Sequence, residues 1–129
     1  MKEIITNGLS FIITCIAYFL GGFDLAIKSL LIIMSIDYLT GVASAVYNKK
    51  LSSKIGFKGI IKKFCYLLVV GLAVVLDNLT GQNGIIRSLV IYCFIANDGI
   101  SIIENLGELE IKLPQKLIDT LEQLKKKGD

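Results

Sequence analysis

The sequence predicts an all-α integral membrane protein with about four transmembrane helices, or three if its first apolar segment does not cross. Three observations predict this: 53% of the 129 residues are hydrophobic, only 19% are charged, and the mean hydropathy is +0.67. A soluble domain usually has about 25% charged residues. One core in a chain of this size does not require so many apolar residues, whereas each membrane span needs about 20 of them.

Four apolar segments are long enough to be spans, at residues 4–20, 25–46, 60–76 and 85–103. The first is the weakest because polar residues interrupt it, namely Thr6, Asn7, Ser10 and Thr14. Helices are expected because an open sheet edge leaves backbone groups unpaired in lipid. We therefore predict a transmembrane domain over residues 1–106 and an amphipathic cytoplasmic tail over residues 107–129.

A basic loop over residues 48–63 sets the predicted orientation. It contains six lysines and no acidic residue: Lys49, Lys50, Lys54, Lys58, Lys62 and Lys63. Short lysine-rich loops remain on the cytoplasmic side. With four spans, this loop and both termini face the cytoplasm. With three, the first segment lies on the surface and the N-terminus lies outside or in the interface.

Part of this loop has the periodicity of a helix. Lysines four residues apart share one helical face, and they are Lys50, Lys54, Lys58 and Lys62. This predicts a short interfacial helix on an anionic inner leaflet, with Ser52 or Ser53 as its N-cap. The alternative is a solvated loop, which Gly56 and Gly59 favour.

A second amphipathic helix is predicted after Pro114. A leucine stripe with helical spacing marks it, consisting of Leu113, Leu117, Leu121 and Leu124. So short a helix is only marginally stable alone in water. We therefore expect it to dock on the membrane surface or on other copies of itself.

Asp37 is the clearest candidate functional residue, because an ionisable group near the middle of a span is costly and usually tied to function or packing. Polar and small residues at helical spacing form a face with it: Asp37, Thr40, Gly41, Ser44 and Ala45. Gly41 and Ala45 permit close helix approach. The face either lines a pore or oligomer seam, or packs against another helix inside one monomer.

The fourth segment has a similar polar side near its cytoplasmic end. Asp98 is expected within the bilayer, and Asp98 and Ser101 are both added to the pore or oligomer face. Glu104 and Asn105 are grouped with Lys50, Lys54, Lys58, Lys62 and Lys63 as cytoplasmic polar residues. At the opposite end, Asp77 and Arg87 flank the outer loop and could pair.

The sequence contains little that could support catalysis. It has no histidine, which removes the commonest general base and metal ligand. The three cysteines, Cys15, Cys65 and Cys93, are far apart and form no metal-binding spacing. We therefore expect no enzyme activity, cofactor, catalytic residue or metal site. Topology explains the lysines, so nucleic-acid binding is not expected.

Several motifs, taken in order, point to a family. They are Asp37-Tyr38-Leu39-Thr40-Gly41, the segment 51–60 followed by Lys62-Lys63, Asn97-Asp98, the segment 101–105, and Leu113-Pro114 before a Leu/Lys-rich end. In order and spacing they resemble the phage-lysis and toxin-secretion holins of Gram-positive phages and clostridia, over about residues 31–124. Two positions depart from that pattern: Asp98, where the family often has Glu, and Glu110, where Gly is frequent.

The resemblance implies a multi-pass protein of the bacterial cytoplasmic membrane that forms homo-oligomers and permeabilises it. An endolysin or a large toxin then crosses. The residues alone leave two other classes open. One is a small four-helix ion channel or proton-coupled transporter that uses Asp37, and the other is a membrane adaptor that recruits a partner through its lysines and tail.

Overall fold

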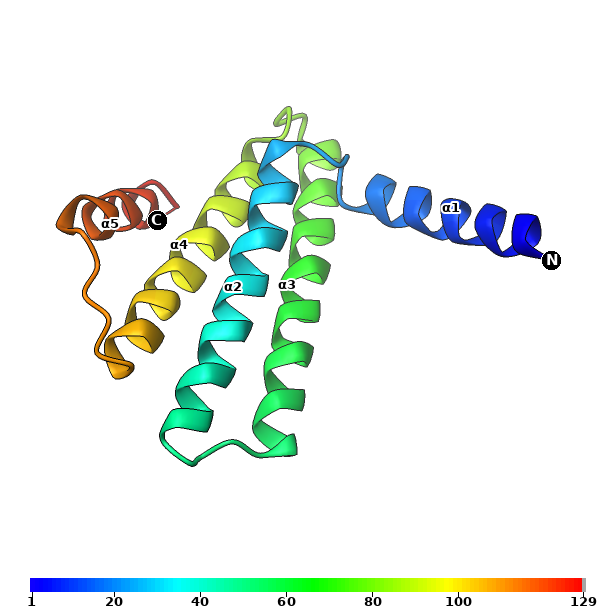
Figure 1. Ribbon diagram of the computed structural model, residues 1–129. Coiled ribbons are helices and arrows are strands. Elements are labelled where there is room, and N and C mark those ends of the chain that lie inside the picture. Colours follow the sequence, from blue (N-terminus) through cyan, green and yellow to red (C-terminus); the bar gives the residue numbers. More distant parts are fainter. Residues whose placement is uncertain (129) are drawn as a thin grey trace.

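The computed structural model describes residues 1–128, which form five helices and, over that range, no strand. The helices are α1 (Lys2–Phe19), α2 (Leu25–Tyr47), α3 (Ser53–Thr80), α4 (Ile85–Glu108) and α5 (Gln115–Gly128). The predicted all-α class is therefore confirmed. Figure 1 shows three long helices side by side, with α1 and α5 projecting to either side.

The three long helices α2, α3 and α4 form the central bundle. Among the described residues, these three are long and apolar enough to cross a membrane, which agrees with the smaller of the two predicted numbers. The helix α4 packs against both α2 and α3, whereas α2 and α3 touch each other much less. The loop at 48–52 and the loop at 81–84 lie at opposite ends of the bundle (Figure 1).

Side-chain caps explain where two of the spans begin. The Asp24 carboxylate accepts a hydrogen bond from the Ile27 amide at 3.1 Å and begins α2. The Ser52 hydroxyl accepts one from the Ile55 amide at 3.2 Å and begins α3. Each satisfies a backbone donor that has no partner in the first turn. At its other end, α3 stops at Gly81, whose φ of 67° is left-handed.

The structure differs from the predicted separate basic helix. The basic segment is helical, but it is the first part of α3, a single helix of 28 residues. At 1.5 Å per residue this helix is about 42 Å long, which exceeds a hydrocarbon core of about 30 Å. The helix continues through Gly56 and Gly59, both of which face the Tyr38 side chain on α2, where a Cβ would make an ordinary contact of 3.4 Å.

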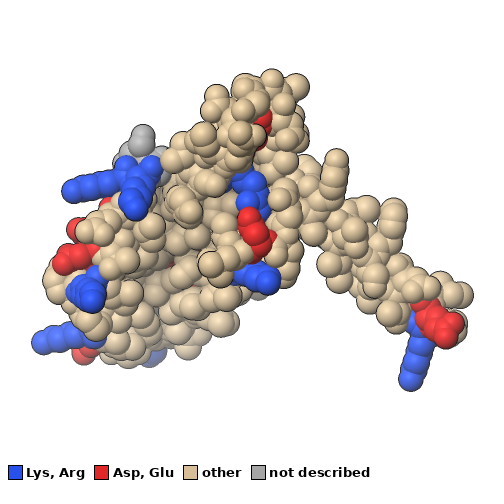
Figure 2. Space-filling view, turned by 90° about the horizontal axis from the view of Figure 1, so that it is seen from above, with Lys and Arg blue, Asp and Glu red and all other residues tan. Residues whose placement is uncertain are grey.

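The bundle interior has an apolar half and a polar half. The fully buried apolar side chains lie toward the 81–84 loop and include Ile27, Leu30, Val70 and Ile91. Beside them, the rings of Tyr66 and Phe94 stack at 4.0 Å between centroids. Most large apolar side chains are instead exposed, as expected where lipid replaces water as the solvent. Figure 2 shows a largely uncharged surface, with charges gathered on the α5 side, in a small group near the centre of the view and at the tip of α1.

The short helix α5 folds back against α4. A Cβ at Gly99 would lie 2.5 Å from a Leu121 methyl carbon, so the absent side chain makes room for the leucine stripe. The predicted amphipathic helix is therefore present, but its apolar face docks on its own chain. We expected this helix to dock on the membrane surface or on another copy of the chain. In the structure it docks on α4.

Candidate functional site

A charged cluster joins the three long helices in the polar half of the bundle. The ammonium of Lys63, on α3, lies 2.6 Å from a carboxylate oxygen of Asp37, on α2. It also lies 3.0 Å from a carboxylate oxygen of Asp98, on α4. The side chains of Lys63, Asp37 and Asp98 are 15%, 13% and 4% exposed. One lysine therefore balances two carboxylates, which leaves a formal charge of −1.

The three residues of this cluster lie at the same distance along the bundle axis from the 48–52 end. Asp37 precedes the end of α2 by ten residues, and Lys63 follows the start of α3 by ten. Asp98 precedes the end of α4 by ten. Each is thus about 15 Å from the helix end on the 48–52 side. A hydrocarbon core of about 30 Å that begins near Thr80 ends only about 4 Å beyond Lys63, so the cluster lies inside the apolar region near its 48–52 side, where ionised groups have to be paired.

The cluster continues along the α2–α4 contact as a line of hydrogen bonds. The Asn105 amide donates to an Asp37 carboxylate oxygen at 3.3 Å and to the Thr40 hydroxyl at 3.0 Å. Further on, the Ser44 hydroxyl donates to the Glu108 carboxylate. The Asn48 amide donates to the same carboxylate at 3.2 Å. We call the cluster and this line of bonds the polar seam, consisting of Asp37, Thr40, Ser44, Asn48, Lys63, Asp98, Asn105 and Glu108.

A cavity of about 210 Å³ lies beside the polar seam. The small residues Gly41, Ala45 and Ser101 line it, together with Asp37 and Lys63. Leu51 also lines it, so the cavity reaches toward the 48–52 loop. All seven residues predicted for the pore or oligomer face therefore lie in or beside the seam. Within one chain they form an α2–α4 contact, which is the second of the two predicted arrangements.

The structure separates the residues predicted to be cytoplasmic and polar into two groups. Lys50, Lys54, Lys58, Lys62 and Glu104 are exposed. Lys63 and Asn105 instead point inward and bond to Asp37. Lys63 follows Lys62 by one residue, and a helix turns by about 100° per residue, so neighbouring lysines face different ways. If the segment is treated as part of one long helix, this rotation predicts from the sequence that Lys63 faces the bundle when Lys62 faces outward.

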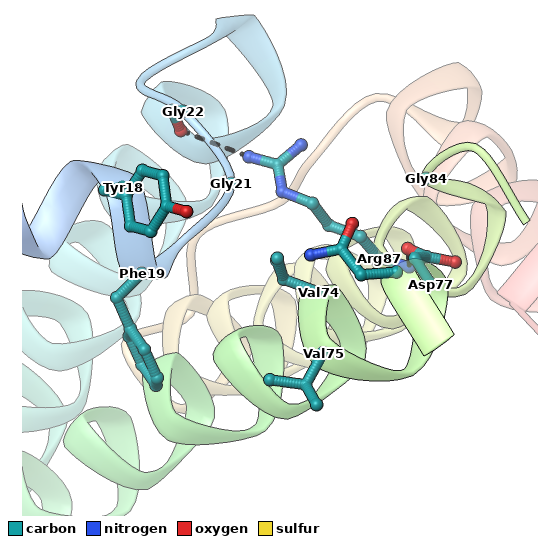
Figure 3. Close-up of a pocket in the computed structure, with 10 residues that line it drawn as sticks. Tyr18, Phe19, Gly21, Gly22, Val74, Val75, Asp77, Gly84 and Arg87 are labelled. Carbon is teal, nitrogen blue, oxygen red and sulfur yellow. Dashed lines mark hydrogen bonds between the residues drawn. The ribbon is translucent and has the colours of Figure 1, made fainter. Parts of the chain in front are cut away.

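A second buried charge lies at the opposite end of the bundle. The Arg87 guanidinium pairs with the Asp24 carboxylate, with one contact of 2.8 Å and a second of 3.1 Å. It also donates to the Leu20 carbonyl at 2.6 Å and to the Gly22 carbonyl at 3.2 Å. Figure 3 shows Arg87 reaching toward the Gly21–Gly22 turn. Arg87 therefore fixes the connection between α1 and α2 to α4.

The partner of Arg87 is Asp24, whereas the sequence predicted a pair with Asp77. Asp77, the predicted partner, accepts from the backbone amides of Ile86 and Arg87, each at 2.9 Å. It thereby caps the start of α4. The hydrogen bond from Arg87 holds the pKa of Asp24 below its ordinary value of 3.8. The pairing joins residues 63 positions apart, which spacing along one helix cannot reveal.

The polar and charged groups inside the bundle are paired with one another. Among the described residues, no buried side-chain nitrogen or oxygen lacks a hydrogen-bond partner, and no cluster of ligand side chains could hold a metal ion. A buried ion pair contributes little net stability compared with apolar packing, but loss of one partner is strongly destabilising. The polar seam is therefore sensitive to any movement that separates α2, α3 and α4.

Comparisons with known proteins identify relatives along almost the whole chain. An uncharacterised protein of Clostridium perfringens strain 13 is 39% identical over 123 residues, covering 95% of this chain and 91% of the relative. An uncharacterised 14.9 kDa protein of Clostridium perfringens, from the nagH 3′ region, is 41% identical over 116 residues and covers 88% and 87%. No solved structure matches.

A phage protein is among these relatives. A protein of Bacillus phage phi105 described as a "probable holin" is 33% identical over 100 residues, covering 78% of this chain and 74% of that protein. The model of the bacteriophage holin family matches residues 14–126, a range that contains α2, α3, α4 and the polar seam. This holin-like membrane protein therefore belongs to the bacteriophage holin family.

Proposed function

We propose that the protein assembles with itself in the bacterial cytoplasmic membrane and permeabilises it, so that an endolysin or a large toxin can cross. The polar seam carries this proposal. It places six polar or charged side chains between helices that can span a membrane and continues to Asn48 and Glu108, which are exposed at the helix ends. A pore through a bilayer needs such groups on its inner wall, because hydrocarbon cannot face a lumen filled with water.

In a single chain the seam is closed, since its groups bond to one another and the outer surface is apolar. This is a form that can accumulate in lipid without creating a passage. If α2 and α4 separate, the seam groups lose their bonds and need new partners. Water in a lumen or the seam of a second copy can supply them, and either outcome favours assembly of several copies around an opening.

The exposed lysines support the orientation that we propose. Lys50, Lys54, Lys58 and Lys62 lie at the end of the bundle with the 48–52 loop, and all four are exposed. Basic residues in short loops favour the cytoplasmic side, where anionic lipids attract them. We therefore assign this loop and the end of α4 at Glu108 to the cytoplasm, and from there α5 folds back along α4 to the level of Gly99. The position of the N-terminus depends on whether α1 crosses the membrane.

The experiment is inducible expression in a bacterium, with membrane potential and release of a folded cytoplasmic reporter protein followed together. We expect a delay, then depolarisation together with reporter release. Asp37→Leu should abolish both while the protein still inserts in the membrane. Leu39→Ala is the matched control, because the Leu39 side chain is 65% exposed on the same helix. Full permeabilisation by Asp37→Leu would contradict the role of the seam.

The charged cluster also supports a second candidate, an ion channel or proton-coupled transporter. Ionisable residues that pair inside a membrane domain are typical of ion and proton pathways. Here the cluster contains two carboxylates and one lysine. Depolarisation without reporter release would favour this candidate. Confirmed membrane expression with neither effect would contradict both candidates and favour the adaptor.

A further inference from the structure

The N-terminal helix α1 is attached to the bundle at one end only. None of its residues is buried, and it does not pack along the other helices. Its attachment is well defined: Leu20 is 3% exposed in the core, and the Phe19 ring contacts Gly71 on α3. The Arg87 guanidinium binds the backbone just beyond it. The direction in which α1 leaves the bundle is therefore fixed.

That direction is crosswise to the spans. Figure 1 shows α1 leaving from the end of the bundle that carries the 81–84 loop and running outward, away from α2 and α3. When α2, α3 and α4 stand across a membrane, a helix attached crosswise at their end follows the membrane surface. The lysines lie at the other end, so this surface is the outer one under the proposed orientation.

A helix on a membrane surface needs an apolar side and a polar side, and the sequence of α1 provides both. With 3.6 residues per turn, one half of the helix carries apolar side chains, including Ile4, Ile5, Leu9, Phe11, Ile12 and Ile16. The other half carries Glu3, Asn7, Ser10 and Thr14, with Ile13 as its one large aliphatic side chain. The only two charged residues, Lys2 and Glu3, are at the free end. Helices with one apolar and one polar half lie in the plane of a membrane interface.

The apolar half faces the membrane centre, and Phe19 shows this. Phe19 belongs to the apolar half, and its ring contacts Gly71, nine residues before the end of α3 at Thr80. This contact is about 14 Å from the 81–84 end, toward the membrane centre. The α3 surface on either side of Gly71 is exposed and apolar at Leu68, Leu72 and Val75, so the lipid-facing surface of the span continues onto α1.

Tyr18 lies at the edge between the two halves of α1, 100° around the helix from Phe19. Tyr18 and Phe19 both line a cavity of about 680 Å³ at the loop end, together with Asn78, Gly84 and Arg87. Figure 3 shows Phe19 directed along α3 while Tyr18, which is 86% exposed, lies nearer the Gly21–Gly22 turn. The apolar half of α1 is thus directed inward, as a position on the membrane surface requires.

We infer that α1 binds the outer lipid surface as an in-plane helix and is not a fourth span. Burial of its apolar half provides the attraction, at about 25 cal/mol for each Å² removed from water. The N-terminus then lies outside, and the protein has three spans. This inference uses the membrane orientation proposed above, but it does not depend on whether the assembled protein opens a large lesion.

The test is labelling of single cysteines in intact cells with a maleimide that cannot cross membranes, in a variant with Cys15, Cys65 and Cys93 changed to Ala. New cysteines replace Lys2, Ser10 or Ile12 in α1. Gln82→Cys, in the 81–84 connection, is the outer control, and Lys50→Cys is the cytoplasmic control. Cells are labelled at the expression level at which Lys50→Cys stays unlabelled, so that the membrane is still closed.

An in-plane α1 predicts that Lys2→Cys and Ser10→Cys react like Gln82→Cys, while Ile12→Cys does not. A spanning α1 predicts that Lys2→Cys reacts only after the cells are permeabilised and that Ser10→Cys reacts in neither case. That result would overturn the inference. Reaction of Ile12→Cys as fast as Ser10→Cys would also overturn it, because α1 would then lie in water. Gln82→Cys that reacts only after permeabilisation would contradict the proposed orientation instead.

Discussion

Lys63 on α3 and Asp37 on α2 form an ion pair of 2.6 Å between two helices that otherwise touch little. Because Asp98 on α4 shares the same ammonium at 3.0 Å, one side chain joins all three candidate spans. The remainder of the interface between α2 and α4 consists of apolar packing and hydrogen bonds, among them those that the carboxylates of Glu108 and Asp37 accept from Ser44, Asn48 and Asn105. Lys63 is therefore the side chain whose loss should change the bundle most.

Lys63→Met is predicted to destabilise the protein by about 3–5 kcal/mol, because it leaves two buried carboxylates without their cation. The adjacent Lys62→Met is the matched control, since it makes the same chemical change at an exposed position of the same helix. Unfolding of the purified protein in mixed detergent micelles measures the difference. Equal stability of the two variants would show that the pairing at Lys63 contributes nothing.

Acid is predicted to weaken the Arg87–Asp24 attachment. Arg87 lowers the pKa of Asp24 below 3.8, so protonation is harder in the folded protein than in the unfolded chain. The stabilising contribution is complete above pH 3.8 and disappears as the pH falls through the lowered value. Thermal unfolding of the detergent-solubilised protein, followed from neutral pH to about pH 2, should be less pH-dependent for Asp24→Asn than for the original protein.

Glu3→Gln provides the control for this pH experiment, because Glu3 is exposed near the free end of α1. Its pH profile should match that of the original protein. If Asp24→Asn also leaves the profile unchanged, the Arg87–Asp24 pair does not contribute to acid sensitivity.

Gly21→Ala is predicted to cost more stability than Gly81→Ala. Both glycines have left-handed backbones, with φ of 84° and 67°, where an alanine costs about 1–2 kcal/mol. At Gly21 the new Cβ would additionally lie 2.7 Å from Nε of Arg87, whereas nothing lies within 4 Å at Gly81. Unfolding in detergent compares them, and a smaller loss for Gly21→Ala would contradict the described position of Arg87.

Gly99→Leu is predicted to release α5 from α4, because the leucine side chain would occupy the space of Leu121. Gly107→Leu is the control on the same helix, with nothing within 4 Å of the new Cβ. Limited proteolysis at the connection over residues 109–114 should become faster only in Gly99→Leu. Similar cleavage rates in both variants would show that the contact at Gly99 does not hold α5.

Local sequence patterns predicted the helices well. Apolar runs located α2 and α4 to within a few residues, and the leucine stripe located α5. Ser52 or Ser53 was expected as a cap, and Ser52 is the one that caps α3. The third span was predicted over residues 60–76, and the helix that contains this range, α3, begins at Ser53. Lysines suggested an interface, but the helix continues through them because exposed lysines are good helix formers.

The pairings were harder to predict than the elements. Asp37 and Asp98 could be singled out, because a carboxylate in an apolar run is conspicuous in one helix. Their common partner Lys63, the Asn105 bonds and the Arg87–Asp24 pair all depend on how separate helices align in space. Which residues of two helices lie opposite each other depends on packing along their whole length. The periodicity of one helix therefore cannot predict these pairings.

The most direct test of assembly through the polar seam is to exchange its charges between two copies of the chain. Asp37→Lys and Lys63→Asp are each expected to abolish reporter release, because each brings like charges together in the cluster. The double variant in one chain should restore insertion and release, which shows that the exchanged pair folds. If seam groups pair between chains during assembly, co-expression of the two single variants should also release the reporter. A working double variant with no release on co-expression would contradict an assembly built through the seam.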